Sequence, residues 1–130
     1  LIHEGQITHQ AMGLHKVLDL GRAWEQETDL PLPLGINVVR RDLGEGVGAR
    51  LSEALRQSIA YAHAHVDEAL EYAMKFGRGI DKETCRRFVL MYVNDYTLAL
   101  GKDGRAAVER LFTLAHRKGL ISAVPPIDPI

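Results

Sequence analysis

The sequence predicts an α/β domain that is rich in helices. Two short apolar runs, Leu14–Leu20 and Ile36–Leu43, have the length and the valine content of strands. From about residue 46 to residue 120, apolar residues recur every three or four positions, which is typical of amphipathic helices. A strand, a short helix, a second strand and then a series of helices together indicate an α/β layer.

The first third of the chain is broken by glycine and proline. The segment Gly21–Asp29 follows the first predicted strand and is long enough for two helical turns. Pro31 and Pro33 then exclude a regular helix and favour an extended path that ends at Gly35. The second predicted strand begins directly afterwards. We expect Trp24 to serve in packing.

The remainder of the chain predicts four helices. The first is indicated by the apolar spacing of residues 49–62, after a flexible entry that contains Gly44, Gly46 and Gly48, and the second ends before Gly77 and Gly79. Asp81 is a natural N-cap for the third, which we expect to continue to Gly101. The fourth extends from about Gly104 to Lys118, with Gly119 just beyond its end, and a proline-rich tail follows as an extended arm. The third helix has the clearest apolar stripe, formed by Cys85, Phe88, Val89, Tyr92, Val93 and Tyr96.

The two predicted strands are too few to form the sheet on which the predicted helices would pack. Either the strands that they cover belong to a part of the protein outside this sequence, or the helices pack together as a small bundle. We favour the first interpretation. Separately, a sequence that begins on Leu1 suggests a fragment.

Composition narrows the classes of partner. The 130 residues suit one domain or part of a larger one, and 16 basic against 17 acidic side chains predict binding to neither nucleic acid nor an anionic membrane. No apolar run approaches the roughly 20 residues of a membrane span. The single cysteine, Cys85, cannot form an intrachain disulfide, which favours a cytoplasmic protein. Its place on a helical stripe predicts a buried side chain.

Few residues form a pattern associated with metal or nucleotide chemistry. The six histidines have no metal-ligand spacing, so we predict no metal site, and we expect His63, His65 and His116 on helix surfaces. The glycines in Gly44–Gly48 lack the order of a nucleotide-binding loop. His3 is the exception, because it follows an apolar pair where a strand could end beside a ligand. A histidine with a pKa of about 6.5 can exchange a proton at neutral pH, although residue chemistry alone favours a structural polar residue near a frayed terminus.

Three stretches together resemble a known enzyme family. The segments beginning "LIHEGQITHQAMG", "LPLPLGINVVRRDLG" and "RFVLMYVNDYTLALGKDG" are similar to the second half of the 1,4-dihydroxy-6-naphthoate synthases, which act on the futalosine route to menaquinone. The resemblance covers nearly the whole chain. It implies the C-terminal half of a type II periplasmic-binding-protein-like fold with two lobes, in which residues 1–35 end the second lobe and place His3 at the cleft. Residues 36–130 would then form a crossing strand and helices that cover the first lobe.

The resemblance also implies a reaction and a set of residues. Family members convert cyclic dehypoxanthine futalosine, a small-molecule substrate, to 1,4-dihydroxy-6-naphthoate, with no metal or organic cofactor. His3 corresponds to the catalytic base, Glu4 and Gln6 are expected to orient it or the substrate, and Gly35 and Asn37 are expected to border the cleft. The N-terminal half of the family is absent here, so we expect incomplete activity, with that half or a second copy as partner. His9 stands where the family often has tyrosine.

Two other functions remain open. The chain could belong to a non-catalytic module that binds a small carboxylate, or to the sister family of chorismate dehydratases. His3 distinguishes the first of these from the synthase, because a binding module needs no proton acceptor.

Overall fold

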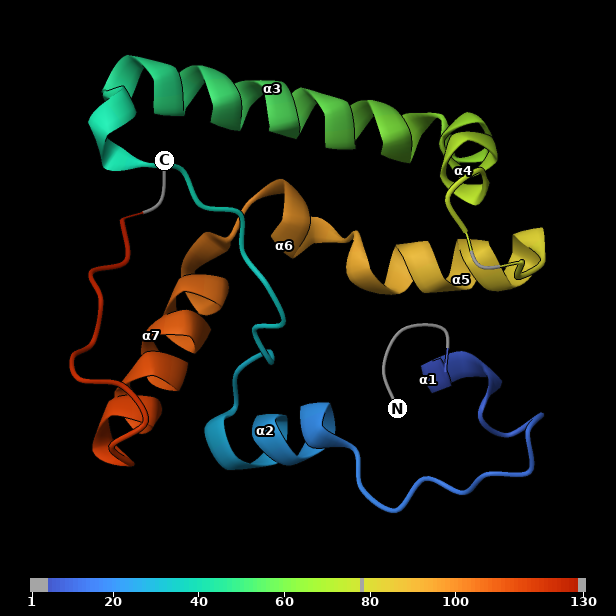
Figure 1. Ribbon diagram of the computed structural model, residues 1–130, viewed down its shortest axis with the longest axis horizontal. Helices are drawn as coiled ribbons and strands as arrows, with labels where there is room; N and C mark the ends of the chain where they lie inside the picture. The colour runs from blue at the N-terminus through green and yellow to red at the C-terminus, as the bar shows by residue number, and fades with distance from the viewer. Residues whose placement is uncertain (1–4, 78, 129–130) are drawn as a thin grey trace. The chain divides into compact units, whose positions relative to one another are not determined.

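The computed structural model describes residues 5–77 and 79–128 (Figure 1). Within these ranges the chain forms seven α-helices and one 3₁₀ helix. In chain order they are α1 (Gly5–Thr8), α2 (Leu20–Thr28), the 3₁₀ helix η1 (Arg41–Leu43), α3 (Glu45–Ala64), α4 (Val66–Met74), α5 (Lys82–Tyr92), α6 (Asp95–Leu98) and α7 (Gly101–Arg117).

The α/β prediction is wrong, because the described residues contain neither a strand nor a sheet. The first predicted strand is irregular until Leu20, where α2 begins, and the second is irregular until Arg41, where η1 begins. The backbone hydrogen bonds in these stretches join residues close in sequence; for example, the N–H of Leu43 donates to the carbonyl of Arg40. A strand requires a hydrogen-bonded neighbour, and the described residues supply none. The two-lobe periplasmic-binding-protein-like fold, which depends on such sheets, is therefore not supported.

The short helix after the first apolar run is confirmed as α2. It begins because the side chain of Asp19 accepts hydrogen bonds from the backbone N–H groups of Gly21 and Arg22, at 3.1 and 3.2 Å. It ends at Asp29, whose φ of 56° is left-handed. The indole Nε1 of half-buried Trp24 donates to the carbonyl of Pro31 at 3.0 Å, which ties the proline segment back to the helix.

The later helices form where they were predicted, but several of their bounds differ. The glycine-rich stretch expected as a flexible entry is already helical, because α3 begins at Glu45. The helix α7 begins three residues before the predicted Gly104 and ends one residue before the predicted Lys118. Asp81 caps α5 as expected, accepting a 2.9 Å bond from the backbone N–H of Thr84. The helix nevertheless stops at Tyr92 rather than near Gly101, and Gly101 begins α7 instead of ending a helix. Beyond α7, Gly119 adopts a φ of 70° and its N–H donates to the carbonyl of His116, as a glycine just past a helix end should.

The chain divides into two compact units, and the boundary between them crosses α3. Unit 1 consists of residues 1–17 and 54–98, and unit 2 of residues 18–53 and 99–130. In unit 1, α4 packs against α5, and the buried side chains include Leu70 and Cys85, as the sequence predicted for the cysteine. In unit 2, α7 buries Ala107 and Val108.

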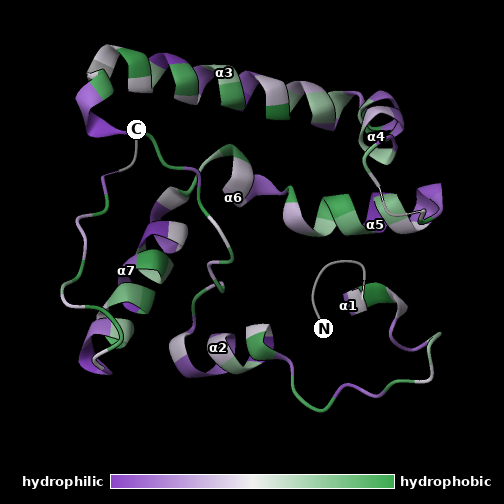
Figure 2. Ribbon diagram, in the orientation of Figure 1, coloured by the Kyte–Doolittle hydropathy of each residue, from purple (hydrophilic) through white to green (hydrophobic). Residues whose placement is uncertain are grey.

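Much of the apolar surface remains exposed. The irregular stretch between α2 and η1 is rich in hydrophobic residues (Figure 2), and Val38 within it is 85% exposed. Leu51 and Leu55 on α3 are also exposed, although they lie on its predicted apolar stripe. None of the described helices combines the length and apolar character needed to cross a bilayer.

Candidate functional site

The residues predicted to form the site lie in different parts of the structure. His3 and Glu4 fall outside the described residues. Gln6 is exposed on α1 in unit 1. Gly35 and Asn37 are exposed in the irregular segment of unit 2 between α2 and η1.

Gln6 is held by a residue far along the sequence. Its amide Nε2 donates a hydrogen bond of 3.1 Å to the hydroxyl oxygen of Tyr92 on α5. Tyr92 is half-buried, and its ring lies against Phe88 at 4.9 Å between centroids with an interplanar angle of 56°. Both rings belong to the apolar stripe predicted from the sequence, and their contact holds the Tyr92 hydroxyl that accepts the hydrogen bond from Gln6.

His9 anchors the other end of α1. It is 8% exposed, and its Nδ1 lies 3.0 Å from the backbone carbonyl oxygen of Gln6. A carbonyl can only accept, so this hydrogen bond requires a proton on Nδ1. The backbone N–H of His9 also donates to the carbonyl of Gly5, and that of Leu14 donates to the carbonyl of His9. Gln6 is therefore fixed through its backbone by His9 and through its side chain by Tyr92.

The turn after α5 is closed by reciprocal hydrogen bonds. The backbone N–H of Asn94 donates to the hydroxyl of Thr97 at 3.1 Å, and the Asn94 side chain accepts from the backbone N–H of Tyr96 at 3.0 Å. The Thr97 hydroxyl in turn donates to the carbonyl of Tyr92 at 3.0 Å. These contacts end α5 at Tyr92 and begin α6, which gives the tyrosine a defined position at a helix end.

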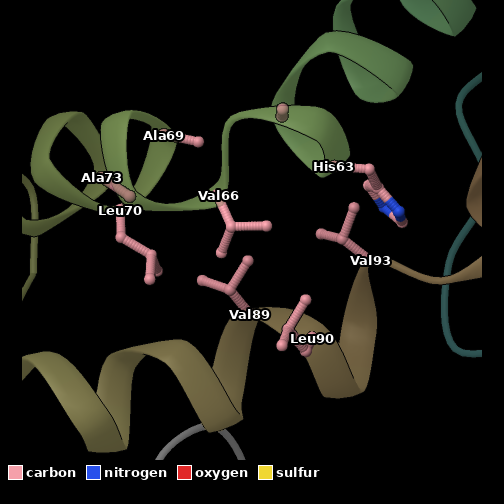
Figure 3. Close-up of a pocket in the computed structure, with 9 residues that line it drawn as sticks. His63, Val66, Ala69, Leu70, Ala73, Val89, Leu90 and Val93 are labelled. Atoms are coloured by element: carbon pink, nitrogen blue, oxygen red, sulfur yellow. The ribbon is translucent and has the colours of Figure 1, made fainter.

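A small cavity lies between α3, α4 and α5 in unit 1 (Figure 3). Its volume is about 50 Å³, and apart from one histidine its lining is aliphatic: Ala62, Val66, Ala69, Leu70, Ala73, Val89, Leu90 and Val93. The exception is His63, which is half-buried and whose Nε2 is buried with no hydrogen-bond partner among the described residues. The space would hold one or two waters, but a single polar atom could not bind them well. This cavity is a packing imperfection rather than a substrate site.

His63 therefore differs from the predicted helix-surface position, whereas His65 and His116 are exposed as expected. The sequence does contain a signal for this position, because His63 lies four residues after Ile59 on α3 and so shares its helix face. The sequence placed Tyr92 on an apolar stripe, and no local pattern indicates its contact with Gln6.

A second, open hollow borders α2. It is lined by Arg22, Glu25, Gln26 and Asp29. These side chains come from one helix and its end and carry both signs of charge, so they select no class of ligand. Within residues 5–77 and 79–128, no three His, Cys, Asp or Glu side chains come together as metal ligands would.

Comparison with known proteins relates the chain to menaquinone synthesis. Residues 1–117 match the model of a family described as menaquinone biosynthesis (VitK2_biosynth). The chain is 46% identical over 125 residues to a 1,4-dihydroxy-6-naphthoate synthase of Thermus thermophilus, in a match that covers 96% of the chain and 46% of the relative. It is 39% identical over 126 residues to a protein of the same name from Streptomyces coelicolor, covering 97% of the chain and 45% of that relative.

The structure also resembles part of a solved protein. An X-ray crystal structure of a protein from Archaeoglobus fulgidus matches with a TM-score of 0.88 and 51% identity, over 93% of this chain and 46% of that one. The chain thus spans about half the length of the curated relatives and of the solved chain that it matches. The match to the family model over residues 1–117 shows that this chain belongs to the menaquinone biosynthesis family.

Proposed function

We propose that this chain supplies part of a 1,4-dihydroxy-6-naphthoate synthase that converts cyclic dehypoxanthine futalosine to 1,4-dihydroxy-6-naphthoate on the futalosine route. The observation that carries the proposal is 46% and 39% identity, across nearly the whole chain, to two relatives with that enzyme name. The chain covers only 46% and 45% of those relatives, so the proposed contribution is partial.

In this proposal His3 is the general base. The imidazole removes a proton from the substrate, after which ring opening and carbon–carbon cleavage lead to the aromatic product. Histidine suits this role because its ordinary pKa, about 6.5, lies near neutral pH. The support for His3 is its place in the I-H-E-G segment, since the residue lies outside the described structure.

Gln6 has structural support as an orienting group. Its side chain is exposed, and its amide nitrogen is held by Tyr92 at 3.1 Å, while the amide oxygen has no hydrogen-bond partner among the described residues. An amide fixed in this way can present its oxygen as an acceptor without first losing side-chain entropy. Glu4, Gly35 and Asn37 are proposed as further contacts, and the exposure of Gly35 and Asn37 is compatible with that role.

A chimaeric enzyme tests the proposal. The matched 125 residues of the Thermus thermophilus relative are replaced by those of this chain, and product is measured by chromatography and absorbance. We expect turnover of the futalosine substrate, and a loss of about 10²–10⁴-fold on His3→Ala, the usual contribution of a general base. His15→Ala is the matched control, because His15 is an exposed histidine outside the proposed site.

Three results would contradict the proposal: a folded but inactive chimaera, normal turnover by His3→Ala, or an equal loss in His15→Ala. A chimaera that is stabilised by substrate without forming product would indicate the carboxylate-binding alternative. Turnover of chorismate in place of the futalosine compound would indicate the dehydratase alternative. Both curated relatives carry the synthase name, so we expect neither outcome.

A further inference from the structure

The helix α1 is too short to hold itself in place. Its four residues include no buried side chain, and one isolated helical turn is not stable in water without tertiary contacts. The helix begins at Gly5, the last residue of the I-H-E-G segment, so its position decides where the side chain of Gln6 lies. Residues that fix α1 can therefore influence the proposed site without touching a ligand.

Two contacts within unit 1 hold Gln6, and they act on different parts of the residue. The Nδ1 of buried His9 donates to the backbone carbonyl oxygen of Gln6 at 3.0 Å, which fixes the helical turn. The hydroxyl of Tyr92 accepts from the side-chain Nε2 of Gln6 at 3.1 Å. Only the second contact restricts rotation of the side chain, so Tyr92 alone of the two sets the direction of the amide.

Tyr92 is itself held on two sides. Its half-buried ring lies against Phe88, with 4.9 Å between the ring centroids, and its backbone carbonyl accepts from the hydroxyl of Thr97 at 3.0 Å. A glutamine side chain has three rotatable bonds and loses much conformational freedom when it is ordered. A partner that is already fixed keeps the Gln6 amide ordered before any ligand arrives.

This arrangement leaves the amide oxygen of Gln6 for a ligand. The side chain is exposed, and its oxygen has no hydrogen-bond partner among the described residues. An amide oxygen accepts hydrogen bonds and donates none, so it selects a hydroxyl or N–H group and disfavours a carboxylate. Because Tyr92 holds the amide nitrogen, binding such a group requires little further ordering of the side chain.

We propose that Tyr92 is a positioning residue of the synthase, which holds the Gln6 amide so that its oxygen accepts a hydrogen bond from a hydroxyl or N–H group of the substrate. The proposal rests on the proposed function, since it assigns Gln6 to the substrate site. Tyr92 acts through Gln6 and does not itself touch the substrate. Its contribution is to binding rather than to proton transfer.

Substrate binding by the chimaera of the preceding section tests this role. KM and kcat are measured in the active chimaera, and Kd by calorimetry in its His3→Ala form, where turnover is slowed. Tyr92→Phe should raise KM and Kd about three- to tenfold, the factor that corresponds to ordering one flexible side chain. It should change kcat by less than about twofold, because the loss is of binding common to the ground state and the transition state.

A purely structural role of Tyr92 would give a different result. Partial unfolding of the variant would lower the concentration of active enzyme, so the apparent kcat would fall while KM stayed constant. Tyr96→Phe is the matched control, because it removes an exposed tyrosine hydroxyl from the same unit and should leave KM, Kd and kcat unchanged. Equal helical circular dichroism at the assay temperature verifies that each variant is folded.

A double-mutant cycle tests whether Tyr92 acts through Gln6. Gln6→Met removes the amide and should raise Kd at least as much as Tyr92→Phe. The double variant should then bind no more weakly than Gln6→Met alone, because the tyrosine hydroxyl has no further effect once its partner is gone. Independent, additive losses would overturn the proposal.

Gln6→Glu tests the chemistry of the substrate group. The carboxylate keeps acceptor oxygens at this position, and the Tyr92 hydroxyl can turn its hydrogen towards one of them. We therefore expect Gln6→Glu to bind the substrate more tightly than Gln6→Met does. Weaker binding by Gln6→Glu would mean that the amide donates to the substrate, and would overturn the assignment of an acceptor.

The outcomes separate this inference from the proposed function. A chimaera that binds the futalosine substrate with the expected coupling between Gln6 and Tyr92 but forms no product would contradict the synthase activity and support the positioning role. An active chimaera in which Tyr92→Phe behaves like Tyr96→Phe, or lowers kcat without raising KM, would overturn the positioning role alone. A chimaera that neither binds nor converts the substrate would overturn both.

Discussion

The side-chain amide of Gln6 donates a 3.1 Å hydrogen bond to the hydroxyl of Tyr92, a residue 86 positions further along the chain. This contact joins α1, the helix that follows the I-H-E-G segment, to the end of α5. It places a tyrosine of the predicted apolar stripe beside a proposed substrate contact.

Tyr92→Phe should loosen α1 while keeping the ring that packs on Phe88. We expect a loss of about 1 kcal/mol in the free energy of unfolding, the usual net value of one hydrogen bond, and faster hydrogen exchange at Gly5–His9. Chemical denaturation and exchange measurements test both effects. Tyr96→Phe, which removes an exposed hydroxyl nearby, should change stability by less than about 0.5 kcal/mol. Equal effects of the two substitutions would show that the Gln6 contact has no stabilising role.

His63→Leu should stabilise unit 1. The substitution removes a buried nitrogen that has no partner in the described structure and leaves an apolar side chain of similar size in an aliphatic cavity. We expect a gain of about 1 kcal/mol, because an unsatisfied buried polar atom carries its full desolvation cost. Thermal unfolding compared with His15→Leu, a substitution at an exposed position, provides the measurement. A destabilised His63→Leu variant would mean that Nε2 has a favourable role.

Asp81 should make the stability of α5 depend on pH. The hydroxyl of Thr84, and then its backbone N–H, hold the pKa of the Asp81 carboxyl below its ordinary value of 3.8. The ionised cap therefore stabilises the fold fully above pH 3.8, and this contribution disappears as pH falls below 3.8 through the lowered pKa. Asp81→Ala should lower the melting temperature by a few degrees at pH 7 and have little effect in strong acid.

Asp81→Asn is the matched variant, because asparagine still accepts at an N-cap but carries no charge. It should lose less stability than Asp81→Ala at pH 7. Identical pH profiles for the wild type and Asp81→Asn would contradict the role assigned to the charge.

Tyr61 should titrate above an ordinary tyrosine. Its hydroxyl donates to Glu68 at 3.1 Å, and that hydrogen bond, followed by the negative charge of Glu68, raises the pKa of Tyr61 above 10.0. The associated stability is present below pH 10.0 and is lost as pH rises through the raised pKa. Absorbance titration near 295 nm should show Glu68→Gln lowering this pKa, whereas Glu71→Gln, one turn away and exposed, should not. A titration unaffected by Glu68→Gln would show that the pair does not persist in solution.

Local chemistry explains which elements could be predicted. Asp81 accepts from an N–H three residues ahead, and Gly119 adopts the left-handed conformation just past α7, so both signals act within one helical turn. By contrast, the apolar stripe of α5 continues to Tyr96, but the bonds between Asn94 and Thr97 end the helix at Tyr92. Apolar periodicity indicates which residues could share a helix face. It does not show where hydrogen bonds from side chains to the backbone close a turn and end the helix.

The sequence by itself determined the existence of the main helices, the burial of Cys85 and membership of the enzyme family, because these depend on neighbouring residues or on a pattern along the whole chain. Only the tertiary structure decided that Ile36–Leu43 forms no strand, that His63 lines a cavity and that Tyr92 binds Gln6. A strand exists only beside a hydrogen-bonded neighbour, and a side chain acquires its partner only when distant segments meet. Those relationships are non-local, so the propensity of a single segment cannot specify them.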